Sequence, residues 1–411
     1  MPINSADTAW VLVSAAMVML MTPGVAFFYG GMVRRKNFLS TLMMCFVTLG
    51  LIGLLWVVYG YSLSFGPDKG GIIGGLNFLG LIGVGQTPSS VYATTIPQLA
   101  FAAFQMMFAV ITVALITGAV VERIKFSSLL VFSALWFTLV YCPVTHWVWG
   151  GGWLQKMGFL DFAGGTVVHI TAGGSALALA IILGPRKGYH EGERMDPSNI
   201  PMVLLGAGIL WFGWFGFNAG SALTSGGLAS SAFMTTYIAG AAGAVTWMIL
   251  GWCYQRPSVL GVATGAVAGL ATITPAAGFV RPIIGIPIGI AASLIGFYCM
   301  AFRSKKTRID ESLDVWAVHG MGGTFGTLAV GFFASLAVNP AGRNGLFYGH
   351  GAQVLIQLTG IAAVWAFAFG MTWGLGKLVD MTMGLRVSPT EESIGLDISQ
   401  HGERAYGGPL R

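Results

Sequence analysis

The chain has 411 residues, of which 55% are apolar and only 9% charged. Soluble domains carry about 25% charged residues, so there is too little charge here to cover a surface that faces water. The 61 glycines suit helices that pack closely in lipid. This composition excludes an ordinary soluble domain and predicts an all-α polytopic membrane protein. The formal net charge is +6, but no basic stripe with interleaved aromatic residues indicates nucleic-acid binding.

Eleven apolar runs are long enough to cross a bilayer, which takes about 20 mostly apolar residues. In chain order they are 8–31, 38–65, 97–121, 127–147, 162–184, 199–220, 231–254, 258–279, 283–302, 315–338 and 353–381. The run 258–279 is rich in Gly and Ala and is the least regular of them. We expect a membrane domain over residues 1–387 and a cytoplasmic tail over 388–411.

The distribution of Lys and Arg gives the expected orientation. With the N-terminus outside, the outer loops hold only Lys69, Lys156, Arg281 and Arg343, and the other 17 of the 21 basic residues lie inside. Basic residues accumulate on the cytoplasmic side of membrane proteins. The sequence therefore predicts eleven spans, with the N-terminus outside and the C-terminus inside.

Two of the predicted spans resemble each other. One opens with Asp161 and carries His169 in DFAGGTVVHITAGG, and the other opens with Asp314 and carries His319 in DVWAVHGMGGTFG. They are five spans apart and run in opposite directions, as in two inverted five-helix repeats followed by one extra helix. Repeats of this kind place a substrate site near the middle of the membrane.

The two histidines are the main candidates for a function inside the membrane. His169 lies about 12 Å into its helix and His319 about 7–8 Å, at 1.5 Å per residue. Ionisable groups at such depth are costly, so they indicate a functional site. The alternative is that each ring only hydrogen-bonds a nearby carbonyl. Two neutral imidazoles can share one N–H, but without further ligands they make a poor metal site.

No enzymatic machinery is visible in the sequence. There is no GxxxxGK[ST] loop, no HExxH and no GxSxG elbow in a suitable context, so we expect neither an enzyme nor a bound cofactor or metal. Cys45, Cys142, Cys253 and Cys299 lie in or beside apolar runs without a CxxC pair, which favours free thiols.

Several aromatic residues stand at positions where they could bind a cation. Trp149 follows the fourth run, Phe104 and Phe108 are one helical turn apart in the third, and Phe217 and Ser221 are four residues apart in the sixth. A cation on an aromatic face gains about 0.5–2 kcal/mol. Ordinary core packing is the alternative for each of them.

Taken together, the motifs resemble the Amt/MEP/Rh family of ammonium transporters, of the bacterial or archaeal Amt type. The segments that carry the resemblance are PGVAFFYGGMVRRKN, LWVVYGYSLSFG, HWVWGGGWL, LDFAGGTVVHI, GWFGFNAGS, ITPAAGFV, VHGMGG, GLRV and GLDISQHGERAY. The resemblance implies a homotrimer in the cell (inner) membrane with one ammonium pore per subunit.

The resemblance also implies roles for particular residues. Trp149, Phe108 and Ser221 match an outer ammonium-recruitment site, and Phe108 and Phe217 match a stacked pair that closes the pore beneath it. His169 and His319 match the twin histidines of the pore.

Two further residues are implied at the recruitment site. Asp161 matches an acid needed there for structure and electrostatics, and Phe104 matches an additional aromatic residue of some members. Ammonium would be deprotonated near the gate, and ammonia would pass along the pore.

Alternative functions remain at this stage. A membrane sensor could use the same pore to bind ammonium and signal to a fused cytoplasmic domain, whereas a Rh-type gas channel fits the recruitment aromatics less well. The tail resembles an ordered family tail, at a face where a PII-type regulatory protein docks. Arg34, Arg35, Lys36, Arg186 and Arg256 are its expected basic partners; a disordered end is the alternative.

Overall fold

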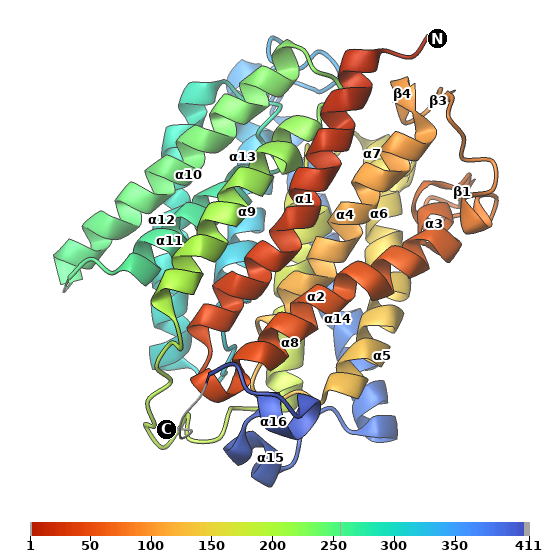
Figure 1. The fold of residues 1–411 in the computed structure, drawn as a ribbon. Coiled ribbons are helices and arrows are strands. Elements are labelled where there is room, and N and C mark those ends of the chain that lie inside the picture. The colour runs from red at the N-terminus through yellow and green to blue at the C-terminus, as the bar shows by residue number, and fades with distance from the viewer. Residues whose placement is uncertain (1, 255, 407–411) are drawn as a thin grey trace.

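Long helices run side by side through the molecule, as the computed structural model shows for residues 2–254 and 256–406 (Figure 1). The first part of the chain contributes α1 (Ser5–Met32), α2 (Phe38–Leu55), η2 (Trp56–Gly60), α3 (Tyr61–Phe65), α4 (Gln98–Thr117), α5 (Phe126–Trp136), η4 (Phe137–Tyr141), α6 (Cys142–Trp149), α7 (Trp153–Met157), η5 (Gly165–Ile170) and α8 (Thr171–Leu183). The second part contributes α9 (Ile200–Gly220), α10 (Gly227–Tyr254), α11 (Val259–Ile273), α12 (Gly285–Lys306), η7 (Trp316–Met321), α13 (Gly322–Phe333) and α14 (Ala352–Met383).

Short elements cover the two ends of this bundle. They are η1 (Arg35–Asn37), β1 (Asp68–Lys69), β2 (Ile73–Gly74), η3 (Leu79–Leu81), β3 (Pro88–Ser89), β4 (Ala93–Pro97), η6 (Pro282–Ile284), η8 (Leu346–Tyr348), α15 (Pro389–Ile394) and α16 (Leu396–His401). The strands form two antiparallel pairs, β1 with β2 and β3 with β4. We call the end at which α1 begins the amino-terminal face, and the end that carries α15 and α16 the tail face (Figure 1).

Within the described ranges, nine helices are long and apolar enough to cross a membrane. Each of the eleven predicted runs overlaps a helix, but two of these helices are not among the nine. The run 258–279 forms only the 15 residues of α11, because the chain turns after Ile273. The run 315–338 forms the consecutive elements η7 and α13, which end at Phe333.

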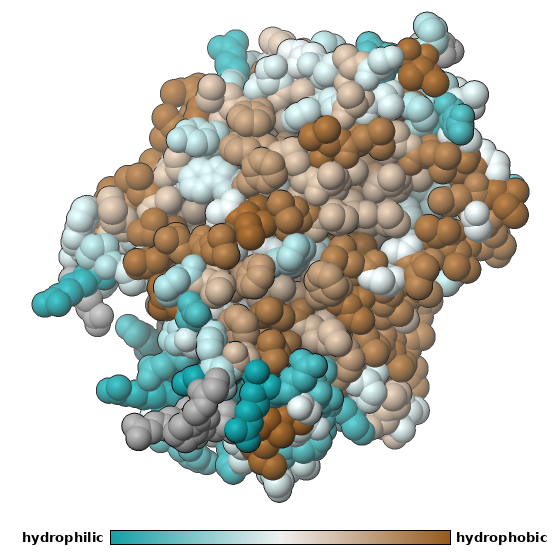
Figure 2. Space-filling model, in the orientation of Figure 1, coloured by the Kyte–Doolittle hydropathy of each residue, from teal (hydrophilic) through white to brown (hydrophobic). Residues whose placement is uncertain are grey.

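The surface explains why the composition is so apolar. In Figure 2, hydrophobic residues cover the middle of the visible face, and hydrophilic residues gather near the tail face. Many large apolar side chains are exposed, such as Leu54, Leu355 and Met381. Exposed apolar surface of this extent is stable only against lipid or another subunit.

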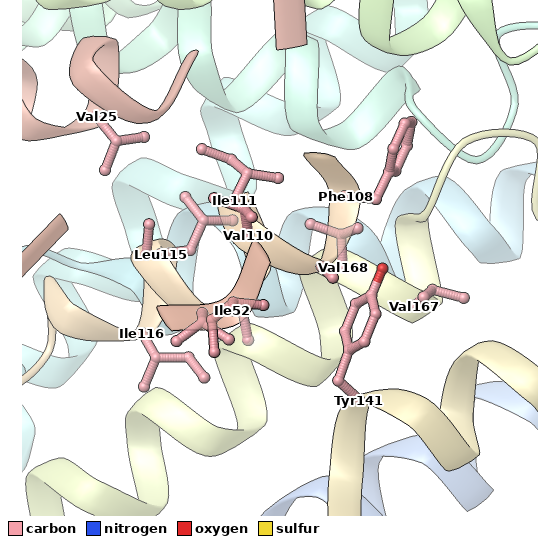
Figure 3. Packing of buried hydrophobic residues seen from close by; sticks show 14 of the residues in the cluster. Val25, Ile52, Phe108, Val110, Ile111, Leu115, Ile116, Tyr141, Val167 and Val168 are labelled. Carbon is pink, nitrogen blue, oxygen red and sulfur yellow. The ribbon is translucent and has the colours of Figure 1, made fainter. Parts of the chain in front are cut away.

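The bundle core is closely packed. Helix α1 lies along α9, and α10 packs against α11 and α12. Buried apolar side chains of α1, α4 and η5 meet in the core, among them Val25, Ile111, Leu115 and Val168 (Figure 3). Glycine lets two backbone segments lie very close together: a Cβ atom on Gly173 would lie 2.2 Å from the Cα of Gly320.

The tail lies against its own bundle. Its first helix has a capping box in which Ser388 and Glu391 bond each other's backbone N–H groups. The Asp397 carboxylate accepts a hydrogen bond from the Ser40 N–H at 2.8 Å, and the Leu396 N–H donates to the Asn37 side chain at 2.8 Å. The described part of the tail, up to residue 406, is therefore built into the fold.

The basic partners of the tail differ in part from those expected. Lys36 donates to the carbonyls of Glu392 and Ser393, and the Arg35 guanidinium lies 4.7 Å from the centre of the Tyr406 ring. Arg34 and Arg186 were wrong as tail partners, because buried acids of the bundle engage them instead.

Candidate functional site

Both histidines lie on π-helical turns at the centre of the bundle. His169 belongs to η5 and His319 to η7. Their Nδ1 atoms are 3.2 Å apart, and their ring centres are 5.1 Å apart at an interplanar angle of 23°. A π-helical turn widens a helix locally and is frequent at functional sites. The structure therefore brings the two predicted rings into direct contact.

One hydrogen bond joins the two rings, so one Nδ1 donates and the other accepts. The Nε2 atom of His169 is buried and has no hydrogen-bond partner among the residues described. Trp214 stacks on the other side of this ring at 5.7 Å between centroids, held by a hydrogen bond from its indole N–H to Thr274. The pair thus presents a polar edge within an apolar wall.

The acid that matches Asp161 is Glu311, not Asp314. The Asp161 carboxylate accepts hydrogen bonds from the N–H of Gly164, Gly165, Thr166 and Val167, at the start of η5. In the other half, the Glu311 carboxylate accepts from the Trp316 N–H at 3.2 Å, at the start of η7. Asp161 and Glu311 each stand eight residues before a histidine.

Asp314 makes a different contact from Asp161. It has a left-handed backbone with φ of 60° and forms an ion pair with Arg303 at 2.8 Å. The sequence comparison of the two spans therefore selected the wrong acid. In the sequence, Asp161 and Glu311 correspond only in their position, eight residues before a histidine, because one is an aspartate and the other a glutamate.

Phe108 and Phe217 form a stacked pair. Their ring centres are 4.2 Å apart at 29°, with both side chains fully buried. The Phe217 ring also stacks on His169 at 6.2 Å, and the Phe108 ring meets the edge of Trp149 at 5.9 Å. The pair therefore separates Trp149 from the histidines.

A cavity of about 310 Å³ opens on the amino-terminal side of this pair and is called the upper vestibule. Trp149, Ser221, Asp161 and Gln105 are among its lining residues. The Ser221 hydroxyl donates to the Phe217 carbonyl at 2.7 Å, which leaves its oxygen free to accept. Trp149 is fixed by its indole N–H, which donates to the Asp161 carbonyl at 2.8 Å.

Two of the predicted recruitment residues are engaged by neighbouring parts of the bundle. Both oxygens of Asp161 already accept backbone N–H groups; burial raises the pKa of this carboxyl, and those N–H groups oppose the rise. Phe104 is fully buried and supports Phe108 edge-on at 4.9 Å, without lining the upper vestibule.

A second cavity lies on the other side of the phenylalanines and is called the histidine cavity. It has a volume of about 20 Å³, and His169, His319, Trp214, Phe217 and Leu115 are among its lining residues. A cavity of this size holds about one water molecule. Apart from the two imidazoles and the aromatic rings, its lining is aliphatic or sulfur-containing.

A third cavity, the lower vestibule, reaches His319 from the tail side. Its volume is about 380 Å³, and its lining includes His319, Arg303 and Asp314. His319 lines both this vestibule and the histidine cavity. Gln105, Trp214, Arg303 and Glu311 are not recognisable as site residues in the sequence, because no local pattern distinguishes a lining residue from a packing residue.

The chain resembles known ammonium transporters along almost its whole length. The Ammonium Transporter Family model matches residues 9–406. The ammonium transporter Amt1 of Archaeoglobus fulgidus is 50% identical over 403 residues, covering 98% of this chain and 100% of that protein. An ammonium transporter of Bacillus subtilis is 49% identical over 401 residues, covering 97% and 98%.

Solved structures show the same fold. The crystal structure of Saccharomyces cerevisiae Mep2 has a TM-score of 0.88 at 36% identity, over 94% of this chain and 88% of that one. A protein described as a sensor Amt protein has a TM-score of 0.89 at 30% identity, over 96% and 98%.

Proposed function

The chain belongs to the ammonium transporter family, and on that premise we propose that a pore within each subunit carries ammonium across the membrane as ammonia. The observation that supports this pore is the order of its parts. The upper vestibule, the Phe108–Phe217 pair, the histidine cavity and the lower vestibule follow one another through the bundle.

Recruitment of the cation takes place in the upper vestibule. The Trp149 ring offers a π face to ammonium, and the Ser221 oxygen accepts one of its N–H groups. Asp161 acts through Trp149 and through the start of η5, because its carboxylate is already occupied. These contacts concentrate ammonium above the phenylalanine pair.

Beyond that pair, passage favours a neutral molecule. Moving a cation into an apolar cavity of about 20 Å³ removes its water, which costs far more than a cation–π contact returns. Ammonium therefore transfers a proton near the gate to the histidine pair, and ammonia passes the two rings. The unpartnered Nε2 of His169 and the shared Nδ1 proton give it polar contacts, and this chain of groups can relay a proton.

The assembly follows from the same family membership. We propose a homotrimer in the cell (inner) membrane, with the amino-terminal face outside and the tail face in the cytoplasm. Eleven crossings then arise from the nine long helices together with α11 and the η7–α13 pair, arranged as two inverted five-helix repeats and one extra helix. The apolar sides of the subunit face lipid and the neighbouring subunits.

Current measurements on purified protein in lipid bilayers test this proposal. An ammonium jump should give a transport signal, which Trp149→Leu should weaken by about 0.5–2 kcal/mol in apparent ammonium affinity if cation–π attraction is the main contribution. Ser221→Ala should add a smaller loss, that of one hydrogen bond. An unchanged affinity in the double variant would place the recruitment site elsewhere.

A sensor is the second candidate, because the fold matches that of a sensor Amt protein. A sensor would use the same vestibule to bind ammonium and would signal through the tail face to a fused domain. Tight ammonium binding without transport would favour this function. At the same face, a PII-type regulatory protein is the proposed partner of a transporter.

A further inference from the structure

A groove on the outside of the bundle has no role in the pore described above. It lies between α12 and the consecutive elements η7 and α13, and its volume is about 530 Å³. Side chains of both helices line it, among them Leu294, Tyr298, Phe302, Phe325 and Leu328. It shares no lining residue with the two vestibules or the histidine cavity. Its volume falls in the range of about 300–1,000 Å³ that is usual for ligand pockets.

The hydroxyl groups of this groove are already engaged by the protein. The Thr324 hydroxyl donates to the Gly320 carbonyl at 2.7 Å and accepts the Trp365 indole N–H at 2.7 Å. The Tyr298 hydroxyl shares a hydrogen bond of 3.0 Å with the Tyr254 hydroxyl. The rest of the lining is aliphatic, aromatic or sulfur-containing. The groove therefore offers its occupant apolar contact, as an acyl chain requires.

Two lysines follow the groove on the same side of α12. Phe302 lines the groove, and Lys305 and Lys306 come three and four residues later, so they lie one helical turn closer to the tail face. Both lysines are exposed, and neither pairs with an acidic side chain in the part of the chain that the structure describes. Unpaired basic side chains at the end of a membrane helix attract anionic headgroups.

We propose that this groove and the two lysines bind an anionic phospholipid of the leaflet on the tail side. One acyl chain lies in the groove, and Lys305 and Lys306 bind the phosphate. From Leu294 to Phe302 the groove extends over about 12 Å, at 1.5 Å per residue. One leaflet contributes about 15 Å of hydrocarbon, so this length suits a single chain. The order of apolar and then basic groups along α12 matches that of a phospholipid whose chain points to the middle of the membrane.

The bound chain would also cover the helical turn that carries His319. Met321 lines the groove and is the last residue of η7, and Thr324 of the groove bonds the carbonyl of Gly320 in the same turn. A chain in the groove thus removes apolar surface of η7 and α13 from exposure. A ligand that binds the folded protein and not the unfolded chain raises the stability of the fold.

A photoreactive phosphatidylglycerol with a diazirine in one acyl chain tests this site on the purified full-length protein in vesicles. Labelled peptides should include residues 294–302 or 321–328, and unlabelled phosphatidylglycerol should compete for them better than phosphatidylcholine. Lys305→Gln and Lys306→Gln together should raise the concentration needed for half-maximal labelling about tenfold or more. Lys377→Gln on α14, outside the groove, is the control and should leave this concentration unchanged.

Two further measurements separate the groove from the lysines. Cys299→Trp fills the groove but keeps both lysines, so it should abolish labelling of 321–328. Phosphatidylglycerol should raise the melting temperature of the wild type more than that of the double lysine variant, and thermal unfolding also checks that each variant folds.

Equal labelling in competition with the two lipids, unchanged labelling in the double lysine variant, or labelling only outside these segments would overturn the inference. A groove covered by a second copy of the chain would give no lipid labelling there and would overturn it as well. Ammonium transport is measured separately, so each of these results leaves the proposed function intact.

Discussion

The two histidines contact each other in a cavity whose other walls are apolar. His169 and His319 share a single Nδ1–Nδ1 contact of 3.2 Å, and Trp214 and Phe217 cover the His169 ring. Neutral imidazoles in such surroundings are polar enough for ammonia but offer no fixed charge to a cation. Their proposed role in a pore therefore depends on both rings and on the space between them.

We expect His169→Ala to change conduction and selectivity while the protein still folds. Removing the ring deletes one partner of the histidine pair and enlarges a cavity of about 20 Å³, so water and larger solutes can enter. Vesicle currents with ammonium, methylammonium and potassium should therefore show altered discrimination. His319→Ala serves as the matched variant. Wild-type transport and selectivity in both would contradict a pore role for the pair.

Glu311 carries a pH-dependent prediction. Burial and the nearby Asp314 carboxylate raise the pKa of Glu311 to about 7, whereas a glutamate in an unfolded chain titrates near pH 4.3. The folded protein thus holds the proton more tightly than the unfolded chain. The stability that this preference contributes is full below about pH 4 and is lost as the pH rises towards 7.

Glu311→Gln should remove this dependence, because the amide keeps an acceptor for the Trp316 N–H without a titrating proton. The melting temperature of the wild type should fall relative to that of the variant between about pH 5 and pH 7. Thermal unfolding of the two purified proteins across this range measures the difference. Parallel profiles would mean that Glu311 does not gain a proton on folding.

At the level of elements, hydrophobicity located the helices but not their internal detail. The apolar runs marked each long helix because lipid requires apolar residues over a whole span. The π-helical turns η5 and η7 were not predictable from hydrophobicity, although an acid accepts a backbone N–H five residues later at the start of each. The stacking of Phe108 on Phe217 likewise depends on how α4 and α9 pack, which spacing within one helix cannot show.

Close contact between the two halves can be tested at Gly173. Helix α8 touches η7, and η5 touches α13, so each half supports the other half's histidine. Gly173→Ala would place a Cβ atom 2.2 Å from the Cα of Gly320. Overpacking of this kind costs about 1–3 kcal/mol and should separate the histidine rings.

Two quantities should be lower in this variant than in the wild type: the melting temperature in thermal unfolding and the rate of ammonium transport. Gly370→Ala on α14 is the control, because a Cβ atom there meets no atom within 4 Å. Equal behaviour of the two variants would show that the contact between Gly173 and Gly320 is not needed.

At the scale of the whole molecule, a buried ionic network joins separate segments at the tail face. Glu122 pairs with Arg34 and Arg186, and Arg186 also pairs with Asp310. Burial alone would raise the pKa of Glu122, but the two arginines hold it below its usual value. Arg34 and Arg186 were expected to pair with the tail, but the sequence does not show that Glu122 and Asp310 lie next to them in the fold.

The tail contacts the chain beside this network. The Glu392 carboxylate accepts hydrogen bonds from Arg386 and from the Lys187 backbone N–H, the latter at 2.6 Å, beside the segment that carries Arg186. The tail therefore contacts the loop between α8 and α9 as well as α2, but none of its residues up to 406 is among those that line the three cavities. Its position suits a regulator of the pore rather than a part of it.

We therefore expect deletion of residues 389–411 to leave a folded protein that still binds ammonium. The cavities keep their linings, whereas the tail contacts with Asn37, Ser40 and Lys187 are lost. Regulation by a PII-type partner, or signalling to a fused domain, should then be abolished. Asp397→Asn is a milder variant, which keeps an acceptor for the Ser40 N–H and should retain regulation. Ammonium titration and partner binding on the same preparations separate the two functions; loss of ammonium binding on truncation would make the tail a structural part of the pore.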